Sequence, residues 1–249
     1  RSDARVSAVA ARLGDVGAAL AGRELAGALV DLGIAFGQGE DTLRGLTPID
    51  DVPLDLRADT SSGVSAAEWL RSSTAGELAW VLHAYGEDDD PLVALRIAEA
   101  VHNWQRRHGT FRTVFQLVEV VMKVKAVEDR GLHPAKLTLQ ALRCFVNGEL
   151  EQLQDFLEDM LSLLAPGGHL AVVTTRRMEA AMVKTFMREH EDSHPMFEAI
   201  SSPQRLLELY PLLQTDKQFA VQQACEPMWP PADSGGSRKP RSFAMHVLK

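Results

Sequence analysis

The longest run of helical patterning in the chain extends from Ser65 to about Lys125, and no segment inside it has the period of a strand. Ser65 and Glu68 stand at the spacing of a capping box, which marks the start of a helix. Apolar residues then recur at helical intervals through SAAEWLRSS, AGELAWVLHAYG, PLVALRIAEAVHNWQRR and TVFQLVEVVMKV. Four successive helices can bury their apolar faces against one another. Residues 51–130 are therefore predicted to form a separate all-helical domain.

Strand patterns occur only before and after this run. The segment ALVD predicts a buried strand that ends near Asp31. HLAVVTT predicts a second short strand, and the alternating tail SRKPRSFAMHVLK predicts a closing strand. Strands separated by helices predict an α/β fold with a parallel sheet. Residues 1–50 and 131–249 are expected to form that sheet domain, with the helical domain inserted between them.

Three further helices are predicted around these strands. The first covers residues 5–20, the second runs without a break from Lys136 to Leu164, and the third is RRMEAAMVKTFMREH. The segment APGG ends the second helix, because proline cannot continue a helix and glycine allows a left-handed turn. Residues 37–63 have no sustained period, and loops of this length in compact domains are usually functional or covered.

The charge of the chain restricts how it can contact nucleic acid. With 34 acidic and 26 basic residues the net charge is −8, which excludes a general basic field that would attract RNA. RNA contacts must then rest on local basic groups. The candidates are Arg176 with Arg177, the tail residues Arg238, Lys239 and Arg241, and Arg106 with Arg107.

Two other classes of function find no support in the sequence. No apolar run approaches the length of a membrane span, so no membrane partner is expected. The two cysteines, Cys144 and Cys225, lie far apart and in no metal-binding spacing, so no metal site is expected.

Ten short segments, in the same order along the chain, resemble the RsmH (MraW) methyltransferases, which methylate a cytosine N4 of bacterial small-subunit rRNA with S-adenosylmethionine. These segments are VDLGIAFGQGE, RGL, PLDLRAD, GVSAAEWL, ELAWVLHAYGE, RIAEAV, HPAKLTLQALRCFVNGELEQL, LAPGGHLAVV, VKTFMRE and KPRS. The resemblance implies a Rossmann-like methyltransferase sheet with an inserted helical domain, in agreement with the layout predicted from the patterns.

The resemblance also implies roles for single residues. Asp31 and Gln38 match family positions that contact S-adenosylmethionine, and ligands of open α/β sheets bind at the carboxyl ends of strands. His133, Asn147 and Glu179 keep the family's residues and are candidates for catalytic roles. Structural interpretations compete with three of these roles. His133 could stand near the N-cap of a helix, Asn147 could bond to backbone, and Asp31 could cap a strand end.

Other positions depart from the family. A Rossmann methyltransferase has a glycine-rich loop after its first strand and an acidic residue after its second, both before the Asp31 strand. The short, helically patterned segment before that strand is not such a loop, so the sheet is predicted to be partial and to lack its N-terminal strands. The family's Phe-His-Ser-Leu-Glu-Asp-Arg corresponds to residues 175–181, where only Glu179 is identical. The changes also include Lys136 with Leu137 and Ala35 with Phe36.

These departures predict a catalytically degenerate relative that binds no S-adenosylmethionine. It would act as a structural or assembly component of a small ribosomal subunit, and the organellar branch of the family implies a mitochondrial one. The alternative is an active rRNA cytosine-N4 methyltransferase whose N-terminal cofactor motif lies outside this sequence, in a bacterium or another organelle. A third possibility is a subunit that pairs with an active paralogue. Expected partners are small-subunit rRNA, ribosomal proteins or assembly factors, and a stable protein partner at the N-terminal sheet edge.

Overall fold

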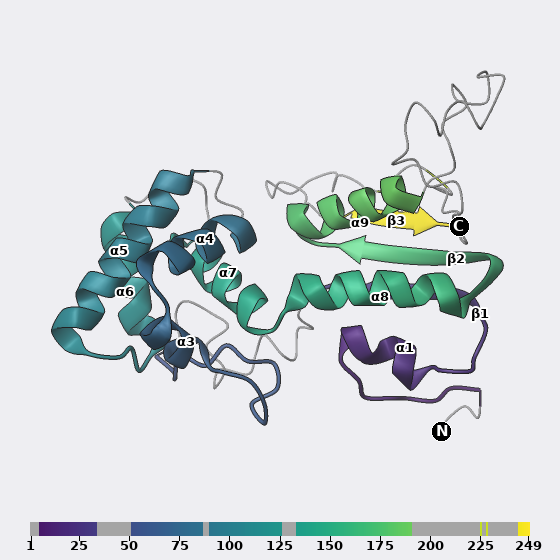
Figure 1. The fold of residues 1–249 in the computed structure, drawn as a ribbon, viewed down its shortest axis with the longest axis horizontal. Helices are drawn as coiled ribbons and strands as arrows, with labels where there is room; N and C mark the ends of the chain where they lie inside the picture. Colours follow the sequence, from purple (N-terminus) through teal and green to yellow (C-terminus); the bar gives the residue numbers. More distant parts are fainter. Residues whose placement is uncertain are drawn as a thin grey trace, which may run out of the picture. The chain divides into compact units, whose positions relative to one another are not determined.

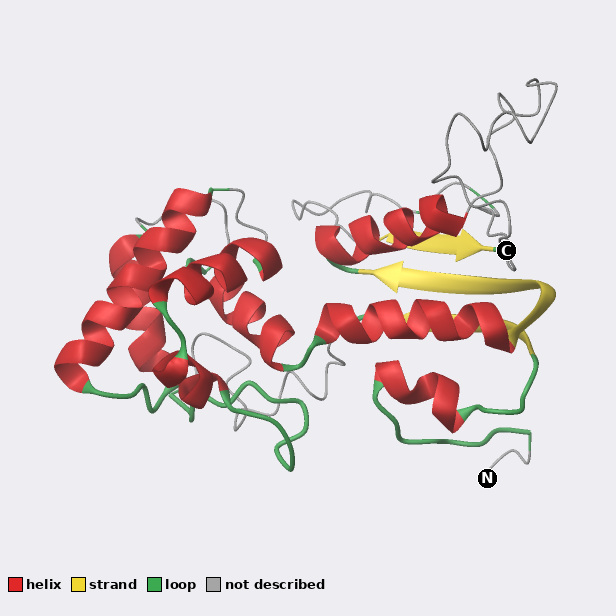
Figure 2. Ribbon diagram, in the orientation of Figure 1, coloured by secondary structure: helices red, strands yellow, loops and turns green. Residues whose placement is uncertain are grey.

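The computed structural model describes residues 5–33, 51–86, 90–125, 133–190, 225, 228 and 244–249. By its internal contacts the chain divides into two compact units (Figure 1): unit 1 contains Arg1–Gly33 with Glu151–Lys249, and unit 2 contains Ile34–Leu150. Among the described residues, strands occur only in unit 1, and the regular elements of unit 2 are helices (Figure 2). No helix in these ranges is long and apolar enough to cross a membrane.

In its described part, unit 1 contains a three-stranded sheet of order β1-β2-β3. The elements, in chain order, are η1 (Leu13–Asp15), α1 (Val16–Ala19), β1 (Leu25–Asp31), α8 (Glu149–Leu163), β2 (Leu164–Thr174), α9 (Arg177–His190) and β3 (Ala244–Leu248). Strand β1 is parallel to β2, whereas β3 is antiparallel to it. The α/β class and the existence of the three predicted strands are therefore confirmed, and the sheet is mixed rather than purely parallel. Two details of the prediction are wrong: β1 has no fully buried residue among its seven, and β2 begins at Leu164 rather than at His169.

The core of unit 1 lies between the sheet and the helices α8 and α9, which cover the same face of the sheet (Figure 1). One apolar cluster joins them: Leu153, Phe156, Leu157 and Met160 from α8, Leu170 and Val172 from β2, and Val183, Phe186 and Met187 from α9. Side chains alternate between the two faces of a strand, so the remaining positions point away from this core. Leu29 of β1 is one of them, and its side chain is 69% exposed.

The helix predicted over residues 5–20 is wrong in its first half. Only residues 13–19 are helical, as η1 and α1, and residues 5–12 are irregular. A short amphipathic segment needs a surface on which to bury its apolar side. Val6 and Val9 have no such surface among the described residues, since they are 74% and 60% exposed. The second half does have one, because Leu13, Val16 and Leu20 pack against the core cluster of unit 1. The backbone N–H of Gly17 also donates to the Asp159 carboxylate of α8 at 3.0 Å.

The single helix predicted from Lys136 to Leu164 is also wrong, because it is two helices. Helix α7 (Lys136–Val146) ends at Asn147, and α8 begins at Glu149. Gly148 between them has a φ of 57°. That conformation lies outside the right-handed helical region and favours glycine. The boundary between the two units falls two residues further on, after Leu150.

Unit 2 is built from α3 (Ala66–Ser72), α4 (Ala75–Tyr85), α5 (Pro91–His108), α6 (Val114–Val124) and α7. The capping box predicted at Ser65 is present: the Glu68 N–H donates to Ser65 Oγ, and the Glu68 carboxylate accepts from the Ser65 N–H. The compact unit extends past the predicted limit of residue 130, because α7 packs against α4. Helix α7 buries Thr138, Leu139, Ala141, Leu142 and Cys144.

Strand β3 carries a buried histidine that links the stability of unit 1 to pH. His246 is 3% exposed, and burial together with the nearby Lys184 lowers the pKa of its imidazole below the ordinary value. The unfolded chain therefore binds the proton more readily than the folded chain. This contribution to stability is complete above the ordinary pKa of about 6.5 and is lost as the pH falls below it.

We expect the free energy of unfolding to decrease as the pH is lowered from about 7.5 to 5.5, by at most about 1.4 kcal/mol per pH unit from this one group. His246→Leu should flatten the dependence. His169→Asn, at an exposed position of β2, is the matched control and should keep it. Urea unfolding followed by circular dichroism at each pH is the measurement. Equal slopes for wild type and His246→Leu would refute the assignment.

Candidate functional site

The carboxyl ends of β1 and β2 meet at one edge of the sheet in unit 1. Asp31 pairs with Val173, and the Leu32 N–H donates to the Val173 carbonyl at 3.0 Å. The chain then continues through Gly33, where an added Cβ would lie 3.6 Å from Thr175 Oγ1. The predicted cofactor residue Asp31 and the segment that begins at Thr175 are therefore neighbours. This is the edge at which open α/β sheets bind their ligands.

Asp31 is the last residue of β1, as predicted, and it is exposed. An exposed carboxylate at this edge could accept hydrogen bonds from a ligand. The second predicted cofactor residue, Gln38, lies outside the described residues.

Glu179 lies at the same edge, in the first turn of α9, and it is 3% exposed. Its Oε2 accepts hydrogen bonds from the N–H groups of Thr175 at 2.8 Å and of Arg176 at 3.1 Å. Its Oε1 accepts from Nε of Arg176 at 2.8 Å. The carboxylate thus closes the turn between β2 and α9 and neutralises a buried guanidinium. Both of its oxygens are bonded within its own turn, which is a structural use of this candidate catalytic residue.

The two arginines predicted to face RNA together have different environments. Arg176 is only 6% exposed and forms the buried ion pair with Glu179. A cation in that position does not offer its charge to a phosphate at the surface, so the expectation of an exposed pair is wrong for Arg176. Arg177 is exposed at the first position of α9. The other predicted RNA contacts in the tail, Arg238, Lys239 and Arg241, lie outside the described residues.

Two of the glycines that precede β1, Gly14 and Gly17, lie against α8. An added Cβ at Gly14 would lie 3.4 Å from Gln152 and Asp155, and one at Gly17 would overlap the Asp159 carboxylate. The space beside both glycines is thus occupied by α8, and the Gly17 N–H is bonded to Asp159. A glycine-rich loop that binds a cofactor must instead present open backbone at the carboxyl edge of the sheet. Gly14 and Gly17 therefore do not form such a loop.

Asn147 and His133 belong to unit 2. The Asn147 side chain donates to the carbonyls of Leu56 and Arg143, both at 2.8 Å, and its oxygen accepts from the Ala58 N–H at 2.6 Å. His133 lies before α7, where its Nδ1 accepts from the Ala135 N–H at 3.2 Å. Both side chains bond to backbone, as the structural interpretation of the sequence proposed.

The loop that Asn147 holds contains a strained residue. Leu56 has a φ of 63° and is 1% exposed. A leucine in this left-handed conformation costs on the order of 1–3 kcal/mol, and such residues are concentrated at functional sites. Asp55 and Arg57 lie on either side of Leu56 in the sequence. The Asp55 carboxylate accepts two hydrogen bonds from the Arg57 guanidinium, at 2.6 and 2.8 Å. These bonds raise the pKa of the guanidinium above its ordinary value.

Arg57 also ties the two ends of this loop together. Its Nη1 donates to the carbonyls of Ser62 and Gly63 at 3.3 and 3.1 Å. Sequence analysis did not identify Leu56, Asp55 or Arg57 as site residues. The one sequence signal at these positions is that the segment PLDLRAD resembles the family.

The candidate residues thus form two groups, each inside one unit. Unit 1 brings Asp31 together with Thr175, Arg176 and Glu179 at the sheet edge. Unit 2 brings Asn147 to the Leu56 loop. In the described part of the chain no three His, Cys, Asp or Glu side chains are grouped as metal ligands.

One comparison with known proteins covers both groups. A family model described as the MraW methylase family matches residues 3–214 of the chain.

Proposed function

Because the chain belongs to the MraW methylase family, we propose that it is a catalytically degenerate member that serves as a structural or assembly component of a mitochondrial small ribosomal subunit. Methylases of this family use S-adenosylmethionine. The segments quoted above resemble enzymes that modify small-subunit rRNA. In the proposed role the chain still binds the small ribosomal subunit, as those enzymes do, but it does not transfer a methyl group.

The ion pair between Glu179 and Arg176 is the main observation in support of a loss of catalytic activity. A general base needs a lone pair that can reach the substrate. Both carboxylate oxygens of Glu179 instead accept hydrogen bonds from residues 175 and 176. The arginine stands where the family has a histidine, so a fixed positive charge replaces a group that can gain and lose a proton near neutral pH.

The proposed absence of S-adenosylmethionine binding is supported by two of the glycines before β1. Gly14 and Gly17 face α8, and their space is occupied by its side chains. Asp31 offers a small number of hydrogen bonds, each worth about 0.5–1.5 kcal/mol net. Micromolar affinity requires about 8 kcal/mol, which these bonds do not reach.

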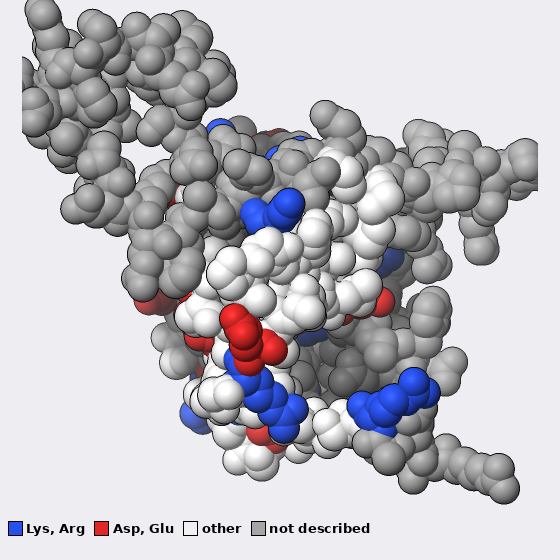
Figure 3. Space-filling view, turned by 90° about the vertical axis from the view of Figure 1, so that its right-hand side faces the viewer, with Lys and Arg blue, Asp and Glu red and all other residues white. Residues whose placement is uncertain are grey.

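A protein partner at β1 is the second part of the proposal. Among the described residues β1 pairs only with β2, so its other edge has unpaired backbone groups. Parallel strands are normally covered on both faces, yet Leu29 is 69% exposed. Figure 3 shows one side of the molecule, where white marks uncharged polar as well as apolar residues and a few acidic and basic side chains stand among them. The open edge of β1 and the exposed Leu29 favour a lasting apolar contact over one held by charge.

The alternative is an active rRNA cytosine-N4 methyltransferase whose cofactor motif lies outside this sequence. The exposed position of Asp31 at the carboxyl end of β1 is the observation in its favour. A carboxylate there remains able to contact a ligand.

Sedimentation tests the proposal: an epitope-tagged chain is expressed in cultured cells that contain a mitochondrial ribosome, and the cell extract is separated in a density gradient. We expect the chain to co-sediment with the small subunit or its precursors in a density gradient. The association should withstand a moderate salt wash, because apolar contacts are weakened less than phosphate contacts. The same fractions are then incubated with methyl-labelled S-adenosylmethionine, and we expect no transfer to rRNA that depends on the tagged chain.

The two measurements separate the alternatives. Recovery of the chain only in the soluble fractions would contradict the ribosomal role. Co-sedimentation with methyl transfer that disappears in Asp31→Asn would establish the active enzyme instead. Leu29→Ala is the partner variant, and it should weaken co-sedimentation, whereas the exposed His169→Asn should not.

A further inference from the structure

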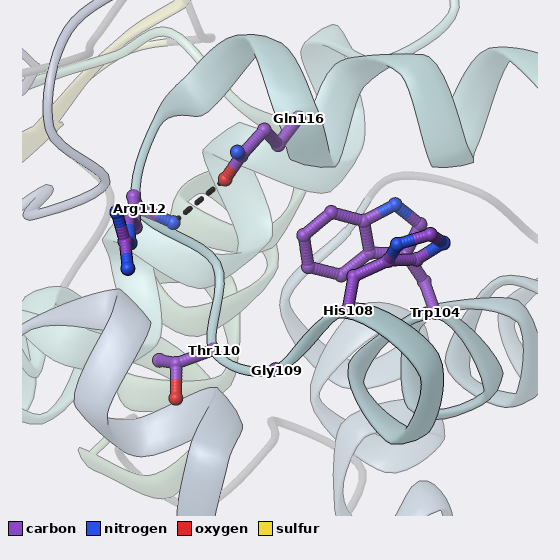
Figure 4. A pocket seen from close by; sticks show the side chains of 6 residues that line it. All are labelled: Trp104, His108, Gly109, Thr110, Arg112 and Gln116. Atoms are coloured by element: carbon purple, nitrogen blue, oxygen red, sulfur yellow. Dashed lines mark hydrogen bonds between the residues drawn. The ribbon is translucent and has the colours of Figure 1, made fainter.

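An open hollow of about 410 Å³ lies in unit 2, where α5 ends and α6 begins (Figure 4). Six residues line it: Trp104, His108, Gly109, Thr110, Arg112 and Gln116. They come from the last turns of α5, the connection after it and the first turn of α6. None of them belongs to the groups described above.

Aromatic rings give the hollow a rigid wall. The Trp104 ring stacks on Phe111, with centroids 4.1 Å apart and planes 12° from parallel. Phe111 is 1% exposed, so the stack is anchored in the core of the unit. Trp104 also contacts His108, with centroids 4.9 Å apart, and the His108 side chain is exposed to solvent. The exposed ring of His108 is therefore the part of this wall against which a further flat ring could stack.

One arginine lines the hollow, and two more lie in the last turn of α5. Arg112 lines the hollow and is exposed, and its backbone is held in place because Gln116 Oε1 accepts the Arg112 N–H at 2.8 Å (Figure 4). Arg106 and Arg107 are exposed in the last turn of α5. Residues 100–118 contain no aspartate or glutamate, although the chain as a whole has a net charge of −8. The sequence around the hollow is thus basic in an acidic protein.

We propose that this hollow binds single-stranded RNA, with a base against the exposed His108 ring and the adjacent phosphate near Arg112. A flat ring beside guanidinium groups matches a nucleotide, which combines an aromatic base with a phosphate. The base must be unpaired, because the rings of paired bases are stacked inside a duplex. This inference deepens the proposed function and rests on it, since it names the part of the chain that contacts rRNA.

Fluorescence anisotropy with a labelled, mixed-sequence, single-stranded oligoribonucleotide tests the site on the full chain. The wild type should bind it more tightly than a duplex of the same length. His108→Ala should weaken binding about tenfold, because stacking of one base on a side chain is lost. His108→Phe should retain most of the affinity, which distinguishes stacking from charge.

Arg112→Ala should also weaken binding and should reduce the salt dependence by about 0.7 in the logarithmic slope, the value for one phosphate contact with a single strand. Arg96→Ala is the matched control. It removes the same charge from an exposed position on α5, about three turns before His108. The affinity and the salt slope should both stay unchanged. Circular dichroism checks that each variant is folded.

The outcomes distinguish this site from the proposed function. If Arg112→Ala and Arg96→Ala weaken binding equally, RNA is held by general charge and the inference about the hollow is wrong. If the single strand does not bind while the chain still co-sediments with small subunits, the inference fails and the proposed function stands. Preference for an acidic peptide over RNA would overturn it as well. If the wild-type chain does not co-sediment with small subunits, by contrast, the proposed function itself is contradicted.

Discussion

Glu179→Ala is expected to lower the free energy of unfolding of unit 1 by about 3–5 kcal/mol, the usual cost of removing one partner from a buried ion pair. Glu179 and Arg176 are 3% and 6% exposed, and their ionic contact is 2.8 Å long. The variant leaves the guanidinium buried without its carboxylate. It also removes the acceptor for the N–H groups of Thr175 and Arg176. Hydrogen exchange of the amides in β2 and α9 measures this change in unit 1 alone.

Two further variants decide what the Glu179 result means. Glu189→Ala changes an exposed glutamate of the same helix and should alter stability by no more than about 0.5 kcal/mol. Replacing both partners, as Arg176→Met with Glu179→Leu, should cost much less than Glu179→Ala, because no buried charge then remains unpaired. Exchange rates in Glu179→Ala that match those of the wild type would show that the pair is not structural. Its place at the sheet edge would then need a functional explanation.

Asn147→Ala is expected to destabilise unit 2 by about 2–3 kcal/mol, since three hydrogen bonds are lost and each contributes about 0.5–1.5 kcal/mol. Two of those bonds join the end of α7 to the carbonyl of Leu56 and the N–H of Ala58, and the third is donated to the carbonyl of Arg143 within α7. They also help to hold Leu56 at its φ of 63°, and a strained residue relaxes when its restraints are removed. The most direct sign is faster hydrogen exchange at the Ala58 amide.

Matched variants make the Asn147 test specific. Asn147→Asp keeps an acceptor for the Ala58 N–H but places a carboxylate against two carbonyl oxygens, so it should be at least as destabilising as alanine. Asn103→Ala removes the same side chain from an exposed site on α5 and should be nearly neutral. Unchanged protection of Ala58 in Asn147→Ala would contradict the anchoring role. The hydrogen bonds of Asn147 would then not be what fixes the Leu56 loop.

Local patterns predicted the elements of the fold well where the chemistry itself is local. The capping box at Ser65 and Glu68 needs only the two side chains and the three residues between them. Strand β1 was expected to end near Asp31 and ends at that residue. The break at Gly148 was missed, because leucines continue at helical spacing on both sides of it. Glycine inside such a pattern is tolerated often enough that the period alone could not place the break.

The candidate sites show the same division. The sequence, together with its resemblance to a known family, determined the family, the α/β class and the candidate site residues. It also kept open whether Asn147 and His133 are structural. Tertiary structure alone decided that Arg176 is buried beside Glu179 while its neighbour Arg177 is exposed. It alone placed the Trp104 ring on Phe111, with His108 beside it and Arg112 in the same hollow. The physical reason is that burial and contact depend on what the rest of the chain packs against each side chain, whereas helix period and capping depend only on residues a few positions away.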